Sequence, residues 1–376
     1  MQGGPAGRPV PEAGAPGRSA AGSGPVVDMR SVEVVAPNFK RRLSGVTSTI
    51  IQLVPLQTRM FGIATLGAGL PDGLPKMRWW QVLSLVRRPQ SGRRRIWHAR
   101  RNVEMLAGLV LRRLMFAPLA LVFTSASQRR HKAWTRFLIR RMDAVIATSR
   151  KTAAYLEVPN AVVMHGIDTA KFSPPADHGA AKAAVGLDPS RTYVGCFGRV
   201  RHQKGTDLFV DAMIALLPSR PGWSAVVAGR TTASHAAFER DLRKRVADAG
   251  LGERILFVGE HSGIAPWYKA LSLFVAPQRW EGFGLTPLEA MASGVPVVAA
   301  DVGAFSELIP EGVAGTVVAR DDLAAMVEAT GRFMDDEGLR ERASQAAVAH
   351  ARDLFSLDRE AQNIRSVYES VWARLP

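Results

Sequence analysis

Short runs of β-branched and other apolar residues alternate along most of this chain with longer segments of helical periodicity. Such alternation is typical of parallel β-sheets whose two faces are covered by helices. The runs form two series, and 376 residues exceed what one hydrophobic core usually serves, so we expect two α/β domains. The expected strands are 31–37, 92–100, 119–125, 144–149 and 161–166, followed by 192–198, 224–229, 255–260, 273–278, 295–300 and 314–319.

The two series set the expected domain boundaries. The turn-rich and proline-containing segment 165–179 is the natural linker between domains at 31–167 and 168–355. A last helix, 356–376, is expected to pack back toward the first domain. Residues 1–30 are rich in Gly, Ala and Pro, lack the apolar run of a signal peptide, and are expected to be disordered. Because parallel sheets bind ligands at the carboxyl ends of their strands, we expect the active site in the cleft between the domains.

Glycines and basic residues follow the first expected strand of the second series. The sequence GCFGRVRHQKG contains Gly198, Arg199, Lys204 and Gly205 directly before a predicted helix. Glycines let a ligand approach the backbone, and a helix N-terminus attracts anions. An arginine and a lysine at this spacing suit a diphosphate. A solvated basic turn explains the same residues, so this cluster alone leaves both interpretations open.

Two glutamates flank a glycine-containing loop after the fourth expected strand of the second series. In RWEGFGLTPLEAMASG, Glu281 lies in the loop and Glu289 in the first turn of a helix predicted to begin near Thr286. Gly282 and Gly284 expose backbone amides to a ligand. Carboxylates accept hydrogen bonds from vicinal sugar hydroxyls, so two of them suit a ligand with two sugar rings. The helix dipole also favours an acid in a first turn, which explains Glu289 but not Glu281.

Together, these clusters resemble retaining nucleotide-sugar glycosyltransferases of family 4, which have the GT-B fold of two Rossmann-like α/β domains facing across a cleft. The family pattern is present as Gly198-Arg199…Lys204-Gly205 and Glu281-Gly282-Phe283-Gly284…Glu289. Residues 165–172 and 292–308 match further family segments, and the resemblance runs from about residue 31 to the C-terminus. Within the family, the chain is most similar to lipopolysaccharide core mannosyltransferases through 37–53, 96–105 and 122–130.

The resemblance implies a donor site that needs no metal or other cofactor. Arg199 and Lys204 would bind the diphosphate of the donor, expected to be GDP-mannose, and stabilise the leaving nucleoside diphosphate. Glu289 would bind the ribose, and Glu281 the hydroxyls of the donor hexose rather than act as a nucleophile. The reaction would retain the anomeric configuration by attack on the face that the diphosphate leaves. Further donor-site residues implied are Gly198, Gly282, Phe283, Gly284 and Leu285, with Val258, Gly259 and Glu260 beside the base.

The resemblance also implies an acceptor site in the first domain. The loop with Arg41, Arg42 and Gly45 would lie near the acceptor and the diphosphate. His98 ends an expected strand and would hydrogen-bond the transferred sugar or the acceptor, although a buried structural histidine is the alternative. Many relatives carry a second histidine two residues later, where this chain has Arg100. Either residue is therefore a candidate for the sugar contact.

Positive charge is concentrated in one part of the chain. Residues 37–151 contain 23 Lys/Arg and 3 Asp/Glu, a net charge of +20, so the whole-chain value of +16 leaves −4 (16 − 20) for the remainder. Such asymmetry is typical of a surface for polyanions. We expect docking on the anionic cytoplasmic face of the inner membrane, or an anionic glycolipid acceptor; a merely solvated patch is the alternative. The expected docking residues are Arg87, Arg88 and 93–95, near Trp79 and Trp80.

Several other functions have less support. A basic nucleic-acid-binding protein without catalysis is the competing class, but the chain shows no recognised nucleic-acid module, and we expect no nucleic-acid partner. A family 4 enzyme with a UDP-sugar donor is the alternative within the family. No GxGxxG follows a strand, which disfavours a dehydrogenase. Cys196 lies in an apolar run. Because it is the single cysteine, a disulfide framework within the chain is excluded. The most apolar segment, 105–126, is interrupted by charges and predicts a buried helix and a strand.

Overall fold

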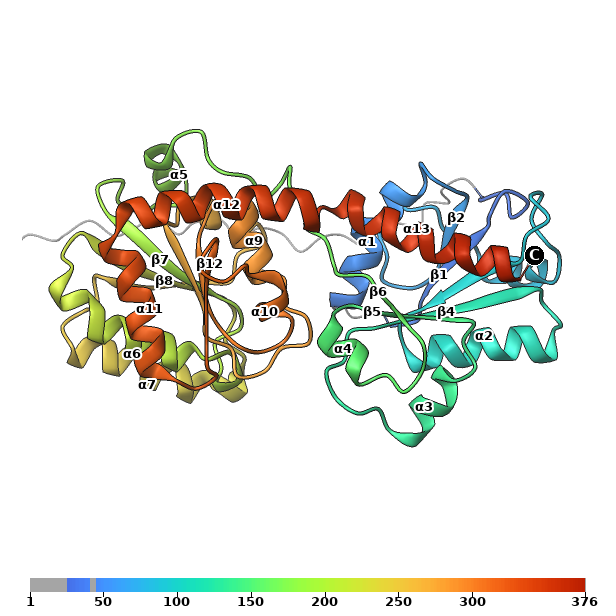
Figure 1. Ribbon diagram of the computed structural model, residues 1–376, viewed down its shortest axis with the longest axis horizontal. Helices are drawn as coiled ribbons and strands as arrows, with labels where there is room; N and C mark the ends of the chain where they lie inside the picture. Colours follow the sequence, from blue (N-terminus) through green and yellow to red (C-terminus); the bar gives the residue numbers. More distant parts are fainter. Residues whose placement is uncertain (1–25, 41–44, 376) are drawn as a thin grey trace, which may run out of the picture.

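The computed structural model describes residues 26–40 and 45–375 and consists of two lobes, each built on one parallel sheet (Figure 1). Most of the segment predicted to be disordered, together with Arg41 and Arg42, lies outside the described residues. At the end of that segment, Met29 is buried, and its carbonyl oxygen accepts a hydrogen bond from Arg95 at 2.9 Å. The prediction of disorder up to residue 30 is therefore wrong at Met29.

The N-terminal lobe contains a six-stranded sheet in the order β2-β1-β3-β4-β5-β6, and all its neighbouring strands are parallel. Every residue of β1 and β3 is buried, as expected for strands covered on both faces. Strand β2 was not predicted, because its short apolar run follows closely on a helical pattern. The strands are β1 Val34–Asn38, β2 Ile63–Gly67, β3 Arg95–Ala99, β4 Leu119–Ser125, β5 Ala144–Ala147 and β6 Ala161–Val162.

The C-terminal lobe contains a second six-stranded parallel sheet, in the order β12-β11-β10-β7-β8-β9. All six of its strands were predicted. Strands β7 and β10 lie at the centre, so the loops that follow them leave neighbouring carboxyl ends. The strands are β7 Thr192–Phe197, β8 Trp223–Ala228, β9 Ile255–Gly259, β10 Leu273–Ala276, β11 Val297–Ala300 and β12 Gly315–Val318.

Helices cover both sheets (Figure 1). In the N-terminal lobe they are α1 Gly45–Gln57, the 3₁₀ helix η1 Trp79–Val86, α2 Asn102–Leu114, α3 Ala133–Ile139 and α4 Arg150–Ala154. In the C-terminal lobe they are α5 His178–Ala184, η2 His202–Lys204, α6 Thr206–Leu216, η3 Leu217–Ser219, η4 Ala233–His235, α7 Ala236–Asp248, α8 Ala265–Lys269, α9 Thr286–Ala292, α10 Phe305–Leu308, α11 Leu323–Asp335 and α12 Glu337–Phe355. The last helix is α13 Leu357–Arg374.

Ser356 separates the two last helices and marks the return of the chain to the N-terminal lobe. Its extended backbone ends α12, and its hydroxyl accepts a hydrogen bond from the amide of Arg359, which caps α13. Ser356 also pairs with Ile167, and backbone hydrogen bonds join Ile167 to Phe355 at 2.7 Å and to Leu357 at 3.1 Å. The two passages of the chain between the lobes are therefore bound to each other.

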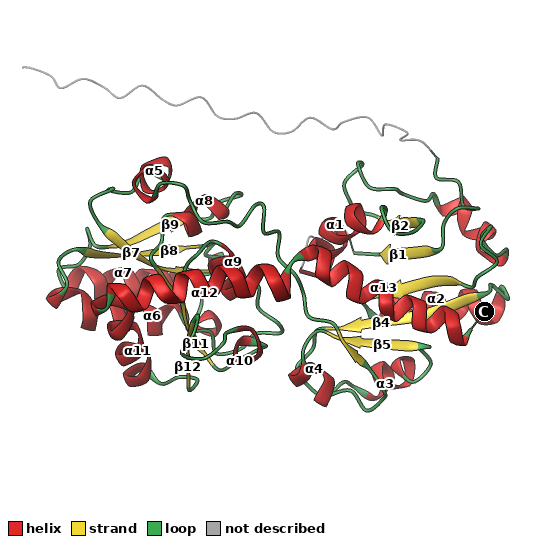
Figure 2. Cartoon of the chain, turned by 45° about the horizontal axis from the view of Figure 1, so that its top comes forward, coloured by secondary structure: helices red, strands yellow, loops and turns green. Residues whose placement is uncertain are grey.

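Helix α13 packs on the N-terminal lobe, while α12 packs on the C-terminal lobe (Figure 2). Buried side chains of α13, among them Ile364, Tyr368 and Trp372, join a core with Val34 and Ile50. Among the described residues, no helix is both long and apolar enough to cross a membrane. The apolar segment after residue 104 forms α2 and β4 as expected, but the outer face of α2 is exposed rather than buried.

Candidate active site

The carboxyl ends of the two sheets meet where the lobes touch. Helix α4 follows β5, and the backbone amides of Arg150 and Lys151 donate to the carboxylate of Glu307 in α10, at 2.7 and 2.8 Å. The ammonium of Lys151 also forms an ion pair with Asp301, directly after β11, at 2.5 Å. These contacts bring together the loops at the edges where parallel sheets bind ligands.

An ion pair joins the two sequence clusters that predicted a donor site. The ammonium of Lys204, after β7, contacts Oε2 of Glu281, after β10. Oε1 of Glu281 accepts a hydrogen bond from the amide of Gly282 at 3.2 Å. Both charged side chains are partly buried, so water screens their attraction less than on an open surface. The structure therefore places a cation and a carboxylate together at the carboxyl edge of the second sheet.

Arg279 cross-links the same two loops and was not among the predicted residues. Its guanidinium donates two hydrogen bonds to Asp207, at 2.7 and 2.9 Å, and a third to the carbonyl oxygen of His202 at 2.6 Å. A two-pronged arginine–carboxylate pair of this kind fixes both partners in orientation. The sequence signal was an arginine two residues before Glu281, which is indistinct in an arginine-rich chain.

Two glycines allow the close packing of these loops. Gly205 has φ +68°, and a side chain there would collide with the carbonyl oxygen of Pro277. Gly284 has φ +89°, and a side chain there would collide with the ring of Phe305. An L-amino acid with a side chain is strained at these angles and has no space, so glycine is required at both positions. The glycines of the motif hold Lys204 near Glu281.

Glu289 lies in the first turn of α9, as predicted, and is held by a residue that the motif does not include. The hydroxyl of Tyr268, in α8, donates to Glu289 Oε2 at 2.8 Å. Burial raises the pKa of Glu289 above its ordinary value, although the Tyr268 hydrogen bond and the charge of Lys171 oppose that shift. Burial and the neighbouring carboxylate raise the pKa of Tyr268 well above its usual range, so the phenol stays a hydrogen-bond donor.

The three residues predicted to lie beside the nucleotide base have two different environments. Val258 packs against the core of the lobe. Gly259 and Glu260 line a cavity of about 250 Å³ together with Arg230 and Glu239. Glu260 is exposed and lies 3.9 Å from Arg230. This cavity lies at the carboxyl ends of β8 and β9, and it presents carboxylates and an arginine to a ligand.

The other predicted donor residues follow the same strand ends. Gly198 continues β7, with its amide 2.9 Å from the carbonyl oxygen of Ala228, and Arg199 after it is exposed. Leu285 is the residue before α9 and packs against the core. The remaining positions are Gly282, close to the carbonyl oxygen of Ala126 in the other lobe, and Phe283, buried with its ring edge-on to His165 at 4.9 Å.

His98 occupies a different environment from the one predicted for a catalytic residue. It is fully buried, with Nδ1 2.6 Å from the hydroxyl of Tyr368 and Nε2 2.7 Å from Oγ1 of Thr124. Burial, with the nearby charge of Arg100, holds its pKa well below the usual range. Both ring nitrogens are therefore occupied, and His98 joins β3 and β4 to α13 instead of facing a ligand. In this conformation His98 has the buried structural environment that the sequence left open as the alternative, and its contact with the sugar stays a prediction.

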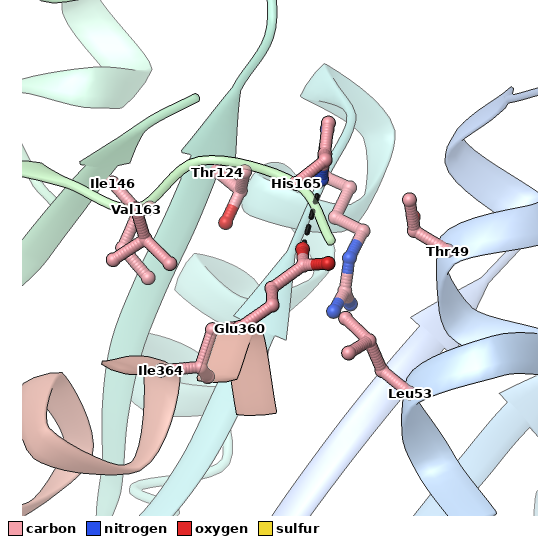
Figure 3. A pocket seen from close by; sticks show the side chains of 9 residues that line it. Thr49, Leu53, Thr124, Ile146, Val163, His165, Glu360 and Ile364 are labelled. Carbon is pink, nitrogen blue, oxygen red and sulfur yellow. Dashed lines mark hydrogen bonds and ion pairs between the residues drawn. The ribbon is translucent and has the colours of Figure 1, made fainter. Parts of the chain in front are cut away.

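Arg100 lines a small cavity at the junction of the lobes. The cavity, of about 10 Å³, has room for about one water molecule and is also lined by Thr49, Thr124, His165 and Glu360 (Figure 3). His165 Nδ1 lies 2.8 Å from Glu360, which also accepts a hydrogen bond from the amide after His165 at 2.7 Å. Burial lowers the pKa of Arg100. Of the two residues left open by the sequence, Arg100 reaches a cavity and His98 does not.

The predicted acceptor loop ends sooner than expected. Gly45 is the first residue of α1, so the segment to Thr47 is helical rather than loop. Nearby, the guanidinium of Arg101 donates to Asn38 at 2.7 Å and to buried Glu104 at 2.8 Å, and Thr47 joins this network. Asn38, Arg101 and Glu104 were not predicted from the sequence. The only sequence signal for this network was the spacing of three residues between Arg101 and Glu104.

Two further expectations concern cysteine and metals. Cys196 lies in the core, as predicted, and burial raises the pKa of its thiol to about 12. Within residues 26–40 and 45–375, no three His, Cys, Asp or Glu side chains are grouped as they would be around a metal ion.

Known proteins match this chain in part of the C-terminal lobe and also over nearly its whole length. Residues 191–336 match the family "Glycosyl transferases group 1". The chain is 63% identical over 350 residues to the lipopolysaccharide core biosynthesis mannosyltransferase LpsB of Rhizobium meliloti (strain 1021), covering 92% of this chain and 99% of that protein. It is 57% identical over 345 residues to the lipopolysaccharide core biosynthesis mannosyltransferase LpcC of Rhizobium leguminosarum bv. viciae, covering 92% and 98%.

Two solved structures show the fold. Anabaena Alr3699/HepE, in complex with UDP and glucose, has a TM-score of 0.74 at 19% identity and covers 90% of this chain and 100% of its own. Sucrose-phosphate synthase from Thermosynechococcus elongatus has a TM-score of 0.72 at 20% identity, covering 91% and 99%. The predicted GT-B fold is confirmed. With two relatives more than half identical over nearly their whole length, the chain belongs to the group 1 glycosyltransferases, in the family of the lipopolysaccharide core biosynthesis mannosyltransferases.

Proposed function

We propose that this glycosyltransferase moves mannose from GDP-mannose to a lipopolysaccharide core or another lipid-linked glycan, with retention of anomeric configuration. The contact of Lys204 with Glu281 carries the proposal, because it sets a cation for a departing diphosphate beside a carboxylate for sugar hydroxyls. The names of LpsB and LpcC support mannose as the sugar and the lipopolysaccharide core as the acceptor.

Arg199 and Lys204 bind the donor diphosphate in this proposal. Both belong to the loop after β7, and Lys204 is held in place by Glu281 and by the turn at Gly205. Fixed cations that meet charge as it develops on the leaving group stabilise the transition state most when the site is partly dry. The two side chains supply this neutralisation, so the proposed reaction uses no metal and no other cofactor.

The two glutamates have separate tasks. Glu289, oriented by Tyr268, accepts hydrogen bonds from the ribose hydroxyls. Glu281 accepts from the hexose hydroxyls, and its pairing with Lys204 makes it a positioning group rather than a nucleophile. The acceptor oxygen then bonds to the anomeric carbon on the face from which the diphosphate leaves. The acceptor proton passes to the departing phosphate oxygen.

Guanine suits the cavity at Gly259 and Glu260 better than uracil. Guanine presents two adjacent N–H donors, whereas uracil presents one, and a carboxylate accepts two hydrogen bonds side by side. Glu260 and Glu239 both line this cavity. A UDP-sugar donor is the alternative, and a competition between the two nucleotides separates them.

The N-terminal lobe receives the acceptor in this proposal. Its arginines suit the phosphates and carboxylates of an anionic glycolipid, and Arg100 reaches the cavity between the lobes. Because such an acceptor is anchored in a bilayer, the enzyme works as a peripheral protein on the cytoplasmic face of the inner membrane. The basic charge then serves lipid and glycolipid rather than nucleic acid.

Substitution of the paired charges tests the proposal. We expect Lys204→Ala to lower kcat for mannosyl transfer about 100- to 1,000-fold, as for removal of a group that stabilises transition-state charge. Glu281→Ala should lower kcat/KM strongly as well, because the sugar loses its acceptor and Lys204 its partner. Transfer and calorimetric binding are measured with GDP-mannose, UDP-glucose and UDP-N-acetylglucosamine.

Lys244→Ala is the matched control, since this lysine pairs with Asp248 on the exposed side of α7 and should leave transfer unchanged. Unaltered transfer in both Lys204→Ala and Glu281→Ala would show that the site is wrongly assigned. If the protein binds a UDP-sugar and not GDP-mannose, the proposed donor is wrong but the proposed donor site remains. Salt-sensitive oligonucleotide binding without any donor binding would support the nucleic-acid alternative.

A further inference from the structure

Helix α2 has an apolar face that no other described part of the chain covers. Its inner face, with Met105 and Leu109, packs in the core of the N-terminal lobe. Its outer face carries Leu106, Val110 and Leu114, which lie at helical spacing and are exposed, Leu114 by 73%. A helix with apolar residues on both faces is normally buried all round, so the outer face of α2 is the exception to explain.

The 3₁₀ helix η1 presents a second apolar ridge. With three residues per turn, Trp80, Leu83 and Val86 lie on one side, and all three are exposed, Leu83 by 68%. On another side, Leu85 is fully buried. The helix is therefore anchored to the lobe through one side and offers an apolar ridge on the other.

The two helices share one groove. A cavity of about 350 Å³ is lined by Trp79, Val82 and Leu83 from η1 and by Val110 and Leu111 from α2. Phe39 also lines this cavity, with its ring centroid 5.7 Å from that of Trp79. The two ridges and the groove between them form one continuous surface, which we call the η1–α2 face. Exposed apolar patches of this kind mark places where another molecule binds.

Phe116 follows exposed Leu114 of α2 by two residues. Its side chain is 85% exposed, and its backbone has φ +54°, in the left-handed region that residues with side chains seldom adopt. Backbone strain and an exposed aromatic ring both oppose stability in water, and such strain persists mainly at functional sites. An apolar phase that takes up the ring would remove the second of these penalties.

Arginines border the η1–α2 face. Residues 73–142 contain 17 Lys/Arg and one Asp/Glu, Glu104, which is buried in its pair with Arg101. The exposed arginines at the ends of the two helices are Arg78, Arg87, Arg88 and Arg113. Arg95, expected in the sequence-based docking patch, is buried instead and donates to three backbone carbonyl oxygens.

We propose that the η1–α2 face docks on an anionic bilayer surface, with its tryptophans, leucines and Phe116 entering the interface and its arginines pairing with lipid phosphates. The bordering arginines favour an anionic partner over a neutral apolar one, and Trp with Leu beside Arg is the composition of interfacial membrane helices. Docking itself does not depend on the proposed function. Only its purpose does, which is to bring the acceptor lobe to a membrane-anchored glycan.

Vesicle binding tests this surface without donor or acceptor. The wild-type chain should bind vesicles of phosphatidylglycerol and phosphatidylcholine, and bind pure phosphatidylcholine much more weakly. The double variant Leu83→Ser/Leu114→Ser should lose at least about tenfold in partition coefficient at any salt concentration. Arg87→Gln/Arg113→Gln should lose about fivefold for each arginine at low salt, and less as salt screens the charge.

Matched exposed positions in the other lobe serve as controls. Leu354→Ser on α12 and Arg240→Gln on α7 should bind the vesicles as the wild type does. The serine variant and both controls should transfer mannose to a delipidated, water-soluble acceptor at the wild-type rate, so a failure of docking is distinguished from a failure of the chemistry. The proposal is overturned if the wild type ignores anionic vesicles, or if the serine variant binds them normally. A dimer that the serine variant dissociates, without vesicle binding, would assign the face to a second copy of the chain.

Discussion

Glu289 shows how a motif residue depends on a partner outside the motif. Pro287 and the preceding glycine loop set the start of α9, so the sequence predicts the position of Glu289 in the first turn. Tyr268 lies 21 residues earlier and on another helix, and only the tertiary fold brings its hydroxyl to the carboxylate. The local pattern therefore identified the acid but not the group that orients and tunes it.

The pH dependence of donor binding should report this pair. Burial raises the pKa of Glu289, so as pH falls this carboxylate takes up a proton sooner than an exposed glutamate and loses an acceptor for the ribose. The Tyr268 hydrogen bond opposes that shift. In Tyr268→Phe, the pKa of Glu289 should rise further, and donor affinity should begin to fall at a higher pH. Calorimetric Kd values across a pH series measure both curves.

The two curves should converge at alkaline pH, where Glu289 is ionised in both proteins. Phenylalanine keeps the ring contacts of Tyr268 with Phe172, Phe197 and Phe274, so the variant should fold. Tyr193→Phe, at a hydroxyl that accepts from the amide of Asp188, is the control for loss of a phenol. If the pH dependence of the donor Kd has the same shape for Tyr268→Phe and the wild type, Glu289 does not contribute to donor binding.

At the scale of elements, α13 explains why both ring nitrogens of His98 have partners within the protein. A histidine at the end of a parallel strand is well placed for catalysis, and the sequence alone does not decide between that role and a structural one. The structure places Tyr368, 270 residues later, against Nδ1 of His98. Trp372 adds a hydrogen bond from its indole to the carbonyl oxygen of Arg94 at 2.9 Å. The C-terminal helix thus turns a strand-end histidine into part of the packing of the lobe.

Tyr368→Phe should therefore reduce stability without a matching loss of catalysis. The variant leaves a buried ring nitrogen of His98 without its partner, at a cost of about 1–3 kcal/mol in the free energy of unfolding. With His98 in a structural role, kcat/KM should change less than about threefold at a temperature where both proteins are folded. Urea unfolding and a transfer assay measure the two quantities.

Tyr155→Phe is the matched control, because that tyrosine is 45% exposed and its hydroxyl should matter little to stability. If Tyr368→Phe instead slows turnover by about two orders of magnitude or more while its stability is unchanged, His98 acts in catalysis rather than only in packing.

The fold was more predictable than the site because periodicity is local and contacts are not. The second sheet was predicted strand by strand, since each run is apolar, short and bounded by turns. Strand β2 was missed because one short run beside a helix resembles the end of that helix. Lys204 and Glu281 follow from motif spacing, whereas Arg279 with Asp207 and His98 with Tyr368 are pairings that only packing creates.

At the scale of the molecule, the chain crosses between the two lobes twice, and a few polar contacts also join the lobes. The chain passes between them at Ile167 and again at Ser356, and these passages are hydrogen-bonded to each other. Beyond this junction, Lys151 pairs with Asp301, and Glu307 accepts from two amides of α4. Such an arrangement is typical of hinge closure, in which a few polar contacts set the balance between open and closed forms.

The double variant Asp301→Asn/Glu307→Gln should shift that balance toward an open form. Exposed ion pairs contribute about 0.2–1 kcal/mol each, so losing these contacts should change the ratio of closed to open molecules by about three- to tenfold. Since both strand edges are needed at the reacting atoms, KM for the donor should rise by a similar factor. Small-angle X-ray scattering should show a larger radius of gyration for the unliganded variant.

Asp335→Asn is the appropriate control, because its ion pair with Arg220 lies within the C-terminal lobe and does not bridge the two. It removes a comparable surface contact and should alter neither the radius nor KM. High salt should mimic the double variant in the wild type, because screening weakens the Lys151–Asp301 pair, and should affect the variant less. If the radius and KM of the double variant equal those of the wild type, the contacts of Asp301 and Glu307 do not set the balance between open and closed forms.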